Sequence, residues 1–391
     1  MKVLFLNYEY PPLGAGAANA TAYLLTEFAK LPELEVHLVT SSLSNHVEHI
    51  RIGGEVYVHR LPIGKDPEKL HSQSMRDIVA YSWKAFLFAS RLVRAEKKKN
   101  KSFDVTLAFF TVPCGFLAYL FHLLFRLPYL VALRGSDVPG YNEKYSFLYI
   151  FLRPLVRLIW KYAAVVIPNS DGLRDLARVT APKQLFKIIP NGVDTAQFFP
   201  DYTKRPDDEI IITPGASRIT DRKGLRYLVE ALEILLPKYP TLKLKIMGDG
   251  SGRETLEAFV RKKKLEDTVI FIGRVPREAT LQYYQEATFF VLPSLNEGMS
   301  NAMLEALACG LPIIATETGG VRELVEEGKN GFIVPLRSGA KIAEALETLL
   351  SQSDKIRTFG EESRQRAEES SWNTVALRFK KSLDESIGKS S

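Results

Sequence analysis

The sequence predicts an α/β protein built from two doubly wound domains with parallel sheets. Three observations predict this fold class. Short apolar runs alternate with stretches of helical spacing along most of the chain, as expected for parallel strands covered by helices. A length of 391 residues predicts two or three domains. With 46% hydrophobic and 25% charged residues, the chain can bury sizeable cores, which excludes a mainly disordered protein.

The elements of the first half follow from local patterns. A hairpin is expected over 50–61, because Gly53-Gly54 separates two strand-like runs. Ser170 follows a predicted strand and is a favourable N-cap for the next helix. The apolar stretch 107–133 contains charged and prolyl residues, so it predicts strand, helix and strand rather than a membrane span. The other predicted strands are 2–7, 34–40, 103–109, 129–133 and 164–168, and the predicted helices are 17–31, 77–99 and 145–162.

The alternation pauses between residues 190 and 208, where turn-forming, polar and prolyl residues gather. This pause predicts an N-terminal domain over 1–196 and a C-terminal domain over 197–371. The predicted strands of the second half are 209–213, 242–247, 269–272, 288–293 and 312–315, and its predicted helices are 224–236, 254–264, 278–286 and 300–309.

The basic charge belongs to the first half. Residues 1–196 carry 24 Lys and Arg against 16 Asp and Glu, whereas residues 197–391 carry 28 against 29. Residues 76–101 hold eight basic and two acidic side chains in an amphipathic pattern with Trp83, Phe86 and Phe88. Such a helix could lie on an anionic membrane, or it could be a solvated helix whose aromatic residues pack on the sheet. Nucleic acid is not expected as a partner, because no recognition motif accompanies the charge.

The cysteines and histidines indicate whether disulfides or a metal site should be expected. Cys114 and Cys309 are too few for a disulfide framework and favour a reducing compartment. His46-x-x-His49 has no other ligand candidate beside it, so no metal site is predicted. The start of the chain has no signal-peptide pattern. We therefore expect a cytoplasmic protein, with a peripheral position on the inner face of a membrane as an option.

Two loops could contact an anionic ligand. Gly14, Ala15 and Gly16 lie between a predicted strand and helix, where small residues let backbone N–H groups approach a ligand at a positive helix end. A tight turn would need the same residues. Arg218 and Lys223 lie in the corresponding loop of the second half, where both could reach a diphosphate. A solvated basic loop is the alternative for this pair.

The segment 293–306 carries the most specific motif. It joins a predicted strand to a predicted helix and places Glu297 before the helix and Glu305 inside it. Glu305 could accept hydrogen bonds from vicinal hydroxyls, as a ribose presents, and Glu297 could hold a sugar hydroxyl. A helix with ordinary acidic residues is the alternative. The N–H groups that could hold phosphate oxygens at the helix start belong to Gly298, Met299, Ser300 and Asn301.

Glu297-x7-Glu305, followed by Gly310-x-Pro312 and Gly319-Gly320, resembles the signature of the family 4 retaining glycosyltransferases (glycosyl transferases group 1). These enzymes have the GT-B fold, in which two Rossmann-like domains face a deep cleft. The resemblance covers roughly residues 1–380. Further segments match in order and spacing, namely Ile189-Pro190-Asn191-Gly192-Val193-Asp194, Arg218 with Lys223-Gly224, Gly248-Asp249-Gly250, Phe271-Ile272-Gly273, Asn330-Gly331-Phe332 and the Gly14–Ala18 loop.

The resemblance implies a nucleoside-diphosphate sugar donor and retention of anomeric configuration. Arg218, Lys223 and the amides of 298–300 would hold the diphosphate, Glu305 the ribose and Glu297 the donor sugar. The backbone around Arg274 and Val275 would meet the base, and Asn191 and Gly248 are expected on the donor side. The chain has no Asp-x-Asp motif, which fits a site without metal or cofactor in which Arg and Lys stabilise the leaving group.

One segment departs from the family pattern. Leu133-Arg134-Gly135-Ser136-Asp137 occupies the position where many members have His-Gly-x-Asp. Arg134 stays protonated and cannot act as a base. Arg134 and Asp137 remain candidates for contacts to sugar or acceptor, although they could also only shape a loop. The segment 371–387 predicts an amphipathic helix, which in this family packs back onto the first domain; a surface helix on the second domain is the alternative.

The sequence therefore predicts a glycosyltransferase that moves a sugar to a saccharide, lipid-linked or other hydroxyl acceptor in glycan or cell-envelope biosynthesis. A nucleotide-sugar 2-epimerase on the same scaffold is one alternative, but the histidines lie in no recognisable motif. A non-catalytic module that binds carbohydrate or nucleotide is the other.

Overall fold

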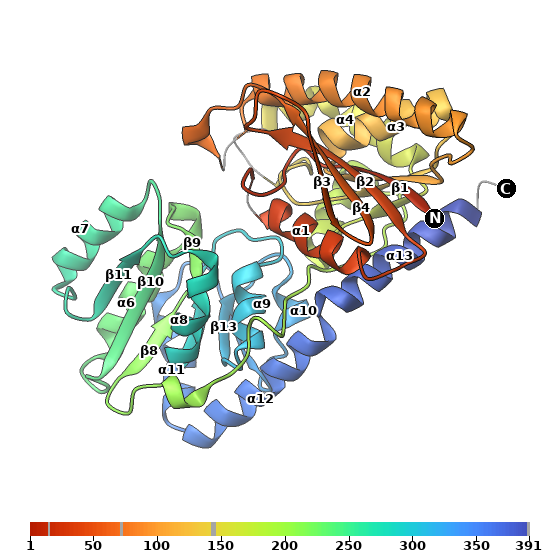
Figure 1. Ribbon diagram of the computed structural model, residues 1–391. Helices are drawn as coiled ribbons and strands as arrows, with labels where there is room; N and C mark the ends of the chain where they lie inside the picture. Colours follow the sequence, from red (N-terminus) through yellow and green to blue (C-terminus); the bar gives the residue numbers. More distant parts are fainter. Residues whose placement is uncertain (15, 71–72, 142–145, 389–391) are drawn as a thin grey trace. The chain divides into compact units, whose positions relative to one another are not determined.

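The computed structural model describes residues 1–388 except 15, 71–72 and 142–145. The chain forms two compact units, one of Met1–Asn191 with Trp372–Ser391 and one of Gly192–Ser371 (Figure 1). Each unit has a seven-stranded sheet. Among the described strands, all pairs are parallel apart from one hairpin in the first unit. Two parallel-sheet α/β units confirm the predicted fold class.

In the first unit the strand order is β3-β4-β2-β1-β5-β6-β7. The two central strands, β1 and β5, are buried along their whole length, as expected when helices cover both faces of a parallel sheet. β3 and β4 form the antiparallel hairpin that Gly53-Gly54 predicted. The strands are β1 (Lys2–Leu6), β2 (Glu35–Ser42), β3 (Glu48–Gly53), β4 (Glu55–Pro62), β5 (Val105–Phe109), β6 (Tyr129–Ala132) and β7 (Val165–Ile167).

Two helical layers cover this sheet. Figure 1 shows α2, α3 and α4 over one face and α1 and α13 along the other. α13 packs against α1 and against β5 and β6, so the C-terminal helix belongs to the first unit. Ser170 caps α5, because its hydroxyl accepts a hydrogen bond from the N–H of Leu173. The helices are α1 (Gly16–Phe28), α2 (Met75–Lys98), α3 (Phe116–Phe125), α4 (Ser146–Tyr162), α5 (Asp171–Thr180) and α13 (Trp372–Gly388), with the short η1 (Pro67–Lys69) and η2 (Thr111–Gly115).

The second unit has the strand order β11-β10-β8-β12-β13-β14, and β9 pairs with β10 beyond the end of β8. Its strands are β8 (Ile210–Thr213), β9 (Ala216–Arg218), β10 (Leu242–Asp249), β11 (Val269–Gly273), β12 (Phe289–Leu292), β13 (Ile313–Thr316) and β14 (Gly331–Val334). Its helices are α6 (Leu225–Leu235), α7 (Arg253–Lys263), α8 (Thr280–Glu286), α9 (Asn301–Ala308), α10 (Val321–Leu324), α11 (Gly339–Leu350) and α12 (Ser353–Glu369), with the short η4 (Tyr202–Lys204), η5 (Asp221–Lys223) and η6 (Arg277–Ala279).

The boundary between the units lies before Gly192, five residues earlier than the sequence predicts. Packing explains this correction. Phe198 is fully buried in a core cluster of the second unit, and Val193 forms an isolated bridge with Ser371 in the same unit. The turn-rich segment therefore belongs to the second unit although its composition resembles a linker.

The sequence predicts that the apolar stretch 107–133 does not span a membrane. Within the described residues, no helix is long and apolar enough to cross a bilayer. The stretch 107–133 forms β5, η2, α3 and β6, which confirms the prediction of strand, helix and strand.

Candidate functional site

Three strand ends of the second unit place the candidate residues. Arg218 is the last residue of β9, and the segment 293–300 follows β12. The segment 317–320 follows β13, the neighbour of β12 in the sheet. Because the carboxyl ends of parallel strands meet at one edge, these loops gather there, which is where open α/β sheets bind ligands. Ser300 caps the helix α9, since its hydroxyl accepts from the N–H of Met303 at 3.3 Å.

Lys223 and Glu297 form an ion pair at this edge. The Lys223 Nζ lies 2.7 Å from the Glu297 Oε2, and both side chains are mostly buried. The hydroxyl of Ser294 also donates to the Glu297 Oε2, at 3.3 Å. The sequence predicts both charged residues in the donor site but not their contact with each other. The pair fixes an ammonium and a carboxylate within one site at the head of α9.

Two glycines hold the loops that carry this pair. Gly224 adopts φ +63°, and a Cβ at this position would collide with the carbonyl oxygen of Pro293. Gly319 adopts φ +35°, and a Cβ there would collide with the carbonyl oxygen of Glu297. The backbone N–H of Gly320 donates to the carbonyl oxygen of Gly298. The loops after η5, β12 and β13 are therefore held together by direct contacts between their backbone atoms.

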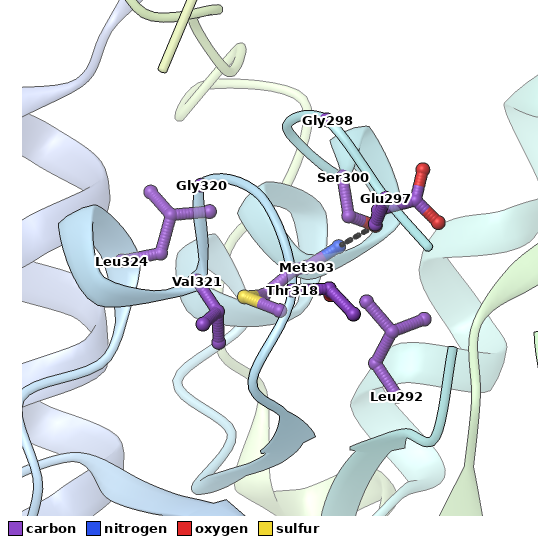
Figure 2. Close-up of a pocket in the computed structure, with 9 residues that line it drawn as sticks. All are labelled: Leu292, Glu297, Gly298, Ser300, Met303, Thr318, Gly320, Val321 and Leu324. Carbon is purple, nitrogen blue, oxygen red and sulfur yellow. Dashed lines mark hydrogen bonds between the residues drawn. The ribbon is translucent and has the colours of Figure 1, made fainter. Parts of the chain in front are cut away.

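A narrow pocket lies beside these loops (Figure 2). Its wall is mainly apolar, and Figure 2 shows the carboxylate of Glu297 pointing away from the apolar side chains. Apolar packing below the loop keeps the backbone of 297–300 in place, while the charged group of Glu297 is directed to the other side. The residues that line the pocket are Leu292, Glu297, Gly298, Ser300, Met303, Thr318, Gly320, Val321 and Leu324.

Glu305 is more enclosed than the motif suggests. It is 6% exposed, and its two carboxylate oxygens contact Arg277 and Tyr284. The Arg277 guanidinium lies 2.9 Å from Oε1, and the Tyr284 hydroxyl donates to Oε2 at 2.9 Å. Burial raises the pKa of Glu305, and Arg277 and Tyr284 oppose that rise. Each oxygen keeps a second lone pair, so a ribose contact remains compatible with this arrangement.

The remaining donor-side predictions lie on neighbouring strands. Arg218 is at the end of β9 and stands opposite Asp249 of β10 in the strand register. Arg274 is exposed, and its Nε lies 3.5 Å from the Asp249 Oδ2. Val275 packs against a core cluster of the second unit and is partly buried there. Gly248 adopts φ +122° directly before Asp249.

Asp137 in the first unit holds a loop together. Its two carboxylate oxygens accept four hydrogen bonds of 2.8–3.1 Å, from the N–H groups of Thr111, Arg134 and Gly135 and from the Thr111 hydroxyl. Burial raises the pKa of Asp137, and these hydrogen bonds oppose the rise. Asp137 is 5% exposed, so its contacts favour a loop-shaping role over a direct contact with substrate.

Arg134 lies against an aromatic ring. Its guanidinium carbon is 3.5 Å from the ring centroid of Phe109, and its Nη1 donates to the Asn191 Oδ1 at 3.0 Å. Burial lowers the pKa of Arg134 to about 9, so the side chain keeps its charge at neutral pH. Asn191, which the sequence places on the donor side, is thus positioned by Arg134 within the first unit.

The glycine loop of the first unit is only partly described. Ala15 lies outside the described residues. Gly14 adopts φ +96°, and its N–H donates to the carbonyl oxygen of Leu70 at 2.9 Å. Gly16 begins α1. Gly14 and Gly16 thus lie between β1 and α1, as the sequence predicts.

The sequence analysis did not identify three residues that contact Glu297 or Glu305. Arg277 and Tyr284 hold Glu305, and Ser294 holds Glu297. Arg277 and Tyr284 lie on η6 and α8, outside every recognised motif. Ser294 directly follows Pro293 in the recognised segment. Its position just after β12, where ligand-binding loops begin, could have indicated a place in the site.

Three histidines of the first unit, His37, His49 and His59, form a cluster. His37 Nδ1 lies 3.0 Å from His59 Nε2, and His59 Nδ1 lies 2.8 Å from His49 Nδ1. These residues join β2, β4 and β3. Among the described residues no group of three or more His, Cys, Asp or Glu side chains is arranged to hold a metal ion.

Family models and known proteins match this chain over nearly its whole length. Residues 194–366 match the model described as glycosyl transferases group 1, and residues 15–192 match the glycosyl transferase 4-like domain. An uncharacterized glycosyltransferase of Methanocaldococcus jannaschii is 23% identical over an alignment of 391 positions, which covers 98% of each chain.

Solved structures give the same result for the fold. A sucrose-phosphate synthase of Thermosynechococcus elongatus superposes with a TM-score of 0.79 and 23% identity over 100% of both chains. Anabaena HepE in complex with UDP-glucose superposes with a TM-score of 0.73 and 18% identity, covering 98% of this chain and 99% of that one. These likenesses confirm the GT-B fold with two Rossmann-like domains.

Proposed function

We propose that this chain, which belongs to the group 1 glycosyltransferases, transfers a sugar with retention from a nucleoside-diphosphate donor to a hydroxyl group of a saccharide or lipid-linked acceptor. The two family models support sugar transfer as the activity of this chain. The observation that carries the donor assignment is the Lys223–Glu297 ion pair at the carboxyl edge of the second sheet. None of the comparisons favours the epimerase or the binding-module alternative.

The diphosphate is the part of the donor that these residues fit best. Lys223 supplies a compact positive charge, and Arg218 supplies a guanidinium on the other side of the same loop. The N-terminus of α9 adds the positive end of a helix dipole beside Glu297. A diphosphate bound here would neutralise Lys223 while Glu297 remains beside the sugar.

The reaction follows from the charge that develops on the leaving group. The bond between the anomeric carbon and the β-phosphate oxygen breaks, and the acceptor oxygen bonds to that carbon from the same face. The departing diphosphate accepts the proton of the acceptor hydroxyl. Lys223, Arg218 and the amides of 298–300 would stabilise the growing negative charge, and we expect this stabilisation to lower the barrier more than any other contact in the site.

We further propose that no divalent ion or cofactor is required. Lys223 and Arg218 provide fixed positive charge where a metal would otherwise bind the diphosphate. UDP-glucose is the first donor to test, because the superposed HepE structure contains it. Transfer in the presence of EDTA would support this proposal, and restoration of a lost rate by added Mg²⁺ would contradict it.

The decisive variant is Glu297→Gln, which removes the charge and keeps the shape of the side chain. We expect release of the nucleoside diphosphate from a sugar donor to fall roughly 100-fold, with an unchanged melting temperature. Glu286→Gln is the matched control, because Glu286 forms a comparable pair with Lys245 at 2.8 Å in the same unit. Equal rates in wild type and Glu297→Gln would overturn the site. The anomeric configuration of the product, read by proton NMR, tests retention separately.

A further inference from the structure

The outer side of α2 carries an exposed apolar row. Met75, Val79 and Trp83 are spaced by four residues, so they lie on one side of the helix. Each of the three is more than 60% exposed. Exposed apolar residues are ordinary when they are scattered, but a continuous row indicates a binding surface.

The two neighbouring helices continue this apolar surface. Leu123 and Leu124 at the end of α3 and Phe151 on α4 are each more than half exposed. Leu158 and Tyr162 extend the same side of α4. We call the outer surface of α2, α3 and α4 the three-helix face.

Ring contacts show that the three helices are adjacent. The rings of Tyr119 on α3 and Tyr162 on α4 are 5.7 Å apart between centroids. The guanidinium of Arg94 on α2 lies 5.6 Å from the ring centroid of Phe125 on α3. Figure 1 shows the same three helices together over one side of the sheet. The three helices therefore lie side by side in one layer, and this layer carries the exposed apolar residues.

The charge on the three-helix face has a single sign. The only acidic residues of α2 are Asp77 and Glu96, and α3 and α4 contain none. Both acidic residues are buried, and they pair with Lys65 and Lys2 at 2.8 Å and 2.5 Å. The exposed charged residues on these helices are Arg76, Lys84, Arg91, Arg94, Lys97 and Lys98 of α2 and Arg153, Arg157 and Lys161 of α4.

The opposite layer of the same sheet differs. On α13, Lys380 pairs with Glu33 and Asp384, and Glu385 pairs with Lys187. Leu377 is the exposed large apolar side chain there, at 47%. Charges of both signs and a single exposed leucine are typical of an ordinary solvated surface. The cationic and apolar character is therefore a property of the three-helix face and not of the unit as a whole.

We propose that the three-helix face binds the surface of an anionic lipid membrane. Apolar side chains flanked by cations suit a bilayer interface, where apolar groups enter the headgroup region and Lys and Arg meet lipid phosphates. A second copy of the chain would place two cationic surfaces against each other, which charge repulsion disfavours. A purely electrostatic polyanion such as nucleic acid would not need the apolar row.

The structure also shows which aromatic residues of α2 are exposed for contact with lipid. The sequence points to Trp83, Phe86 and Phe88 together. Phe86 instead stacks on Phe121 at 5.8 Å, and Phe88 packs against His59 at 5.1 Å. Only Trp83 of the three is exposed, so this single tryptophan is the aromatic anchor that α2 offers to lipid.

Tryptophan fluorescence provides a direct test. The chain has three tryptophans, and Trp160 and Trp372 are buried whereas Trp83 is 65% exposed. We expect vesicles of phosphatidylglycerol mixed with phosphatidylcholine to shift the emission of the wild type to shorter wavelength and to protect it from acrylamide. Vesicles of phosphatidylcholine alone should have little effect, and added salt should weaken the binding.

Vesicle co-sedimentation of variants separates the apolar and the charged contributions. Trp83→Ser with Val79→Ser should weaken binding roughly tenfold or more, and Arg91→Glu should weaken it by at least roughly fivefold. Leu377→Ser and Lys381→Glu on α13 are the matched controls and should bind as the wild type does. Circular dichroism and an unchanged melting temperature would establish that each variant is folded.

Three results would overturn the proposal. One is the absence of binding to the anionic vesicles by folded wild-type protein. Another is loss of binding in the α13 controls but not in the α2 variants. The third is self-association, or binding to single-stranded DNA, that is lost in Trp83→Ser while vesicle binding is unaffected. The inference does not depend on the donor site: the surface variants should keep the response to nucleoside diphosphates, and Glu297→Gln should keep vesicle binding.

Discussion

The two units share one architecture but place their charges differently. The first unit carries 28 Lys and Arg against 17 Asp and Glu, and the second carries 24 against 28. In the second unit, charged groups meet in the interior of a site, as in the Lys223–Glu297 and Arg277–Glu305 pairs. In the first unit, cations are spread over the outside of three helices. Under both proposals, the functional residues lie in loops and on outer surfaces rather than in the doubly wound sheet itself.

Two lysine–carboxylate pairs make the comparison testable. Lys223 and Glu297 lie 2.7 Å apart in the second unit, on two loops at a strand edge. Lys65 and Asp77 lie 2.8 Å apart in the first unit, where Asp77 also completes the capping box of α2. The two pairs look alike as contacts. We expect the first to act in catalysis and the second in folding.

The largest effect is expected for Lys223→Ala. Losing one positive charge at the departing diphosphate should lower the transfer rate by about 100-fold to 1000-fold. The melting temperature should change less than for loss of Lys65, because the Lys223 and Glu297 side chains keep 14% and 17% exposure, whereas the Lys65 side chain keeps 1%. Steady-state kinetics and a melting curve on the same preparation check both parts. Wild-type turnover in Lys223→Ala would contradict a catalytic role for the Lys223–Glu297 pair.

Lys65→Ala should lower the stability of the protein and leave its transfer rate unchanged. It leaves the buried carboxylate of Asp77 without its cation, which should cost about 3 kcal/mol of unfolding free energy. Transfer by the folded fraction should be unchanged. Urea unfolding together with an assay below the unfolding transition tests this. A loss of activity without a loss of stability would contradict it.

Glycine substitutions sharpen the comparison within the second unit. Gly319→Ala would place a Cβ against the carbonyl oxygen of Glu297, whereas a Cβ at Gly328 would meet no atom within 4 Å. Both glycines have positive φ, so both substitutions carry backbone strain of about 1 kcal/mol. We expect Gly319→Ala to cost about 2 kcal/mol more than Gly328→Ala and to weaken donor binding. Equal melting temperatures and equal donor affinities of the two variants would show that the close approach at Gly319 is unimportant.

The smallest effect concerns the histidines of the first unit. Burial lowers the pKa of His59 to about 3, with His37 and His49 adding to the shift, from an ordinary value of 6.5. The unfolded chain therefore takes up a proton below about pH 6.5 that the folded chain excludes. This contribution to stability is complete above that pH and falls as the solution is acidified, by about 1.4 kcal/mol at about pH 5.5.

His59→Phe isolates this contribution. The variant should lose less stability than the wild type between about pH 7 and about pH 5.5, even if it is less stable at neutral pH. Urea unfolding at both pH values measures the difference. Parallel pH profiles of the two proteins would show that His59 does not remain neutral in the folded state.

Periodicity and turn residues were sufficient for most of the fold. The alternation of apolar runs and helical spacing predicted both sheets, and Gly53-Gly54 and Ser170 marked a hairpin and a cap that the structure contains. The short strand β9 was missed, because three residues are too few to show an alternation of apolar and polar side chains. α12 was missed because its sequence is strongly polar and its buried side is short.

The candidate site could be predicted as a set of residues but not as a set of contacts. The motif spacing identified Lys223 and Glu297, whereas the ion pair between them depends on two loops 74 residues apart in sequence. Arg277 and Tyr284 were missed because their role is to hold Glu305, and no local pattern marks a residue that acts through another. Asp137 was identified from its position, but its four hydrogen bonds follow from a backbone turn that the sequence does not specify.

We propose that the loops around Lys223 and Glu297 bind a nucleoside diphosphate. Thermal unfolding of the wild type and of Lys223→Ala with UDP, GDP, ADP, CDP and dTDP, each in excess EDTA, measures this binding. A ligand at 100 times its dissociation constant adds about 2.7 kcal/mol, which raises the melting temperature by a few degrees. We predict that one of the five nucleotides stabilises the wild type and has little effect on Lys223→Ala. No shift with any nucleotide, or the same shift in both proteins, would contradict the claim.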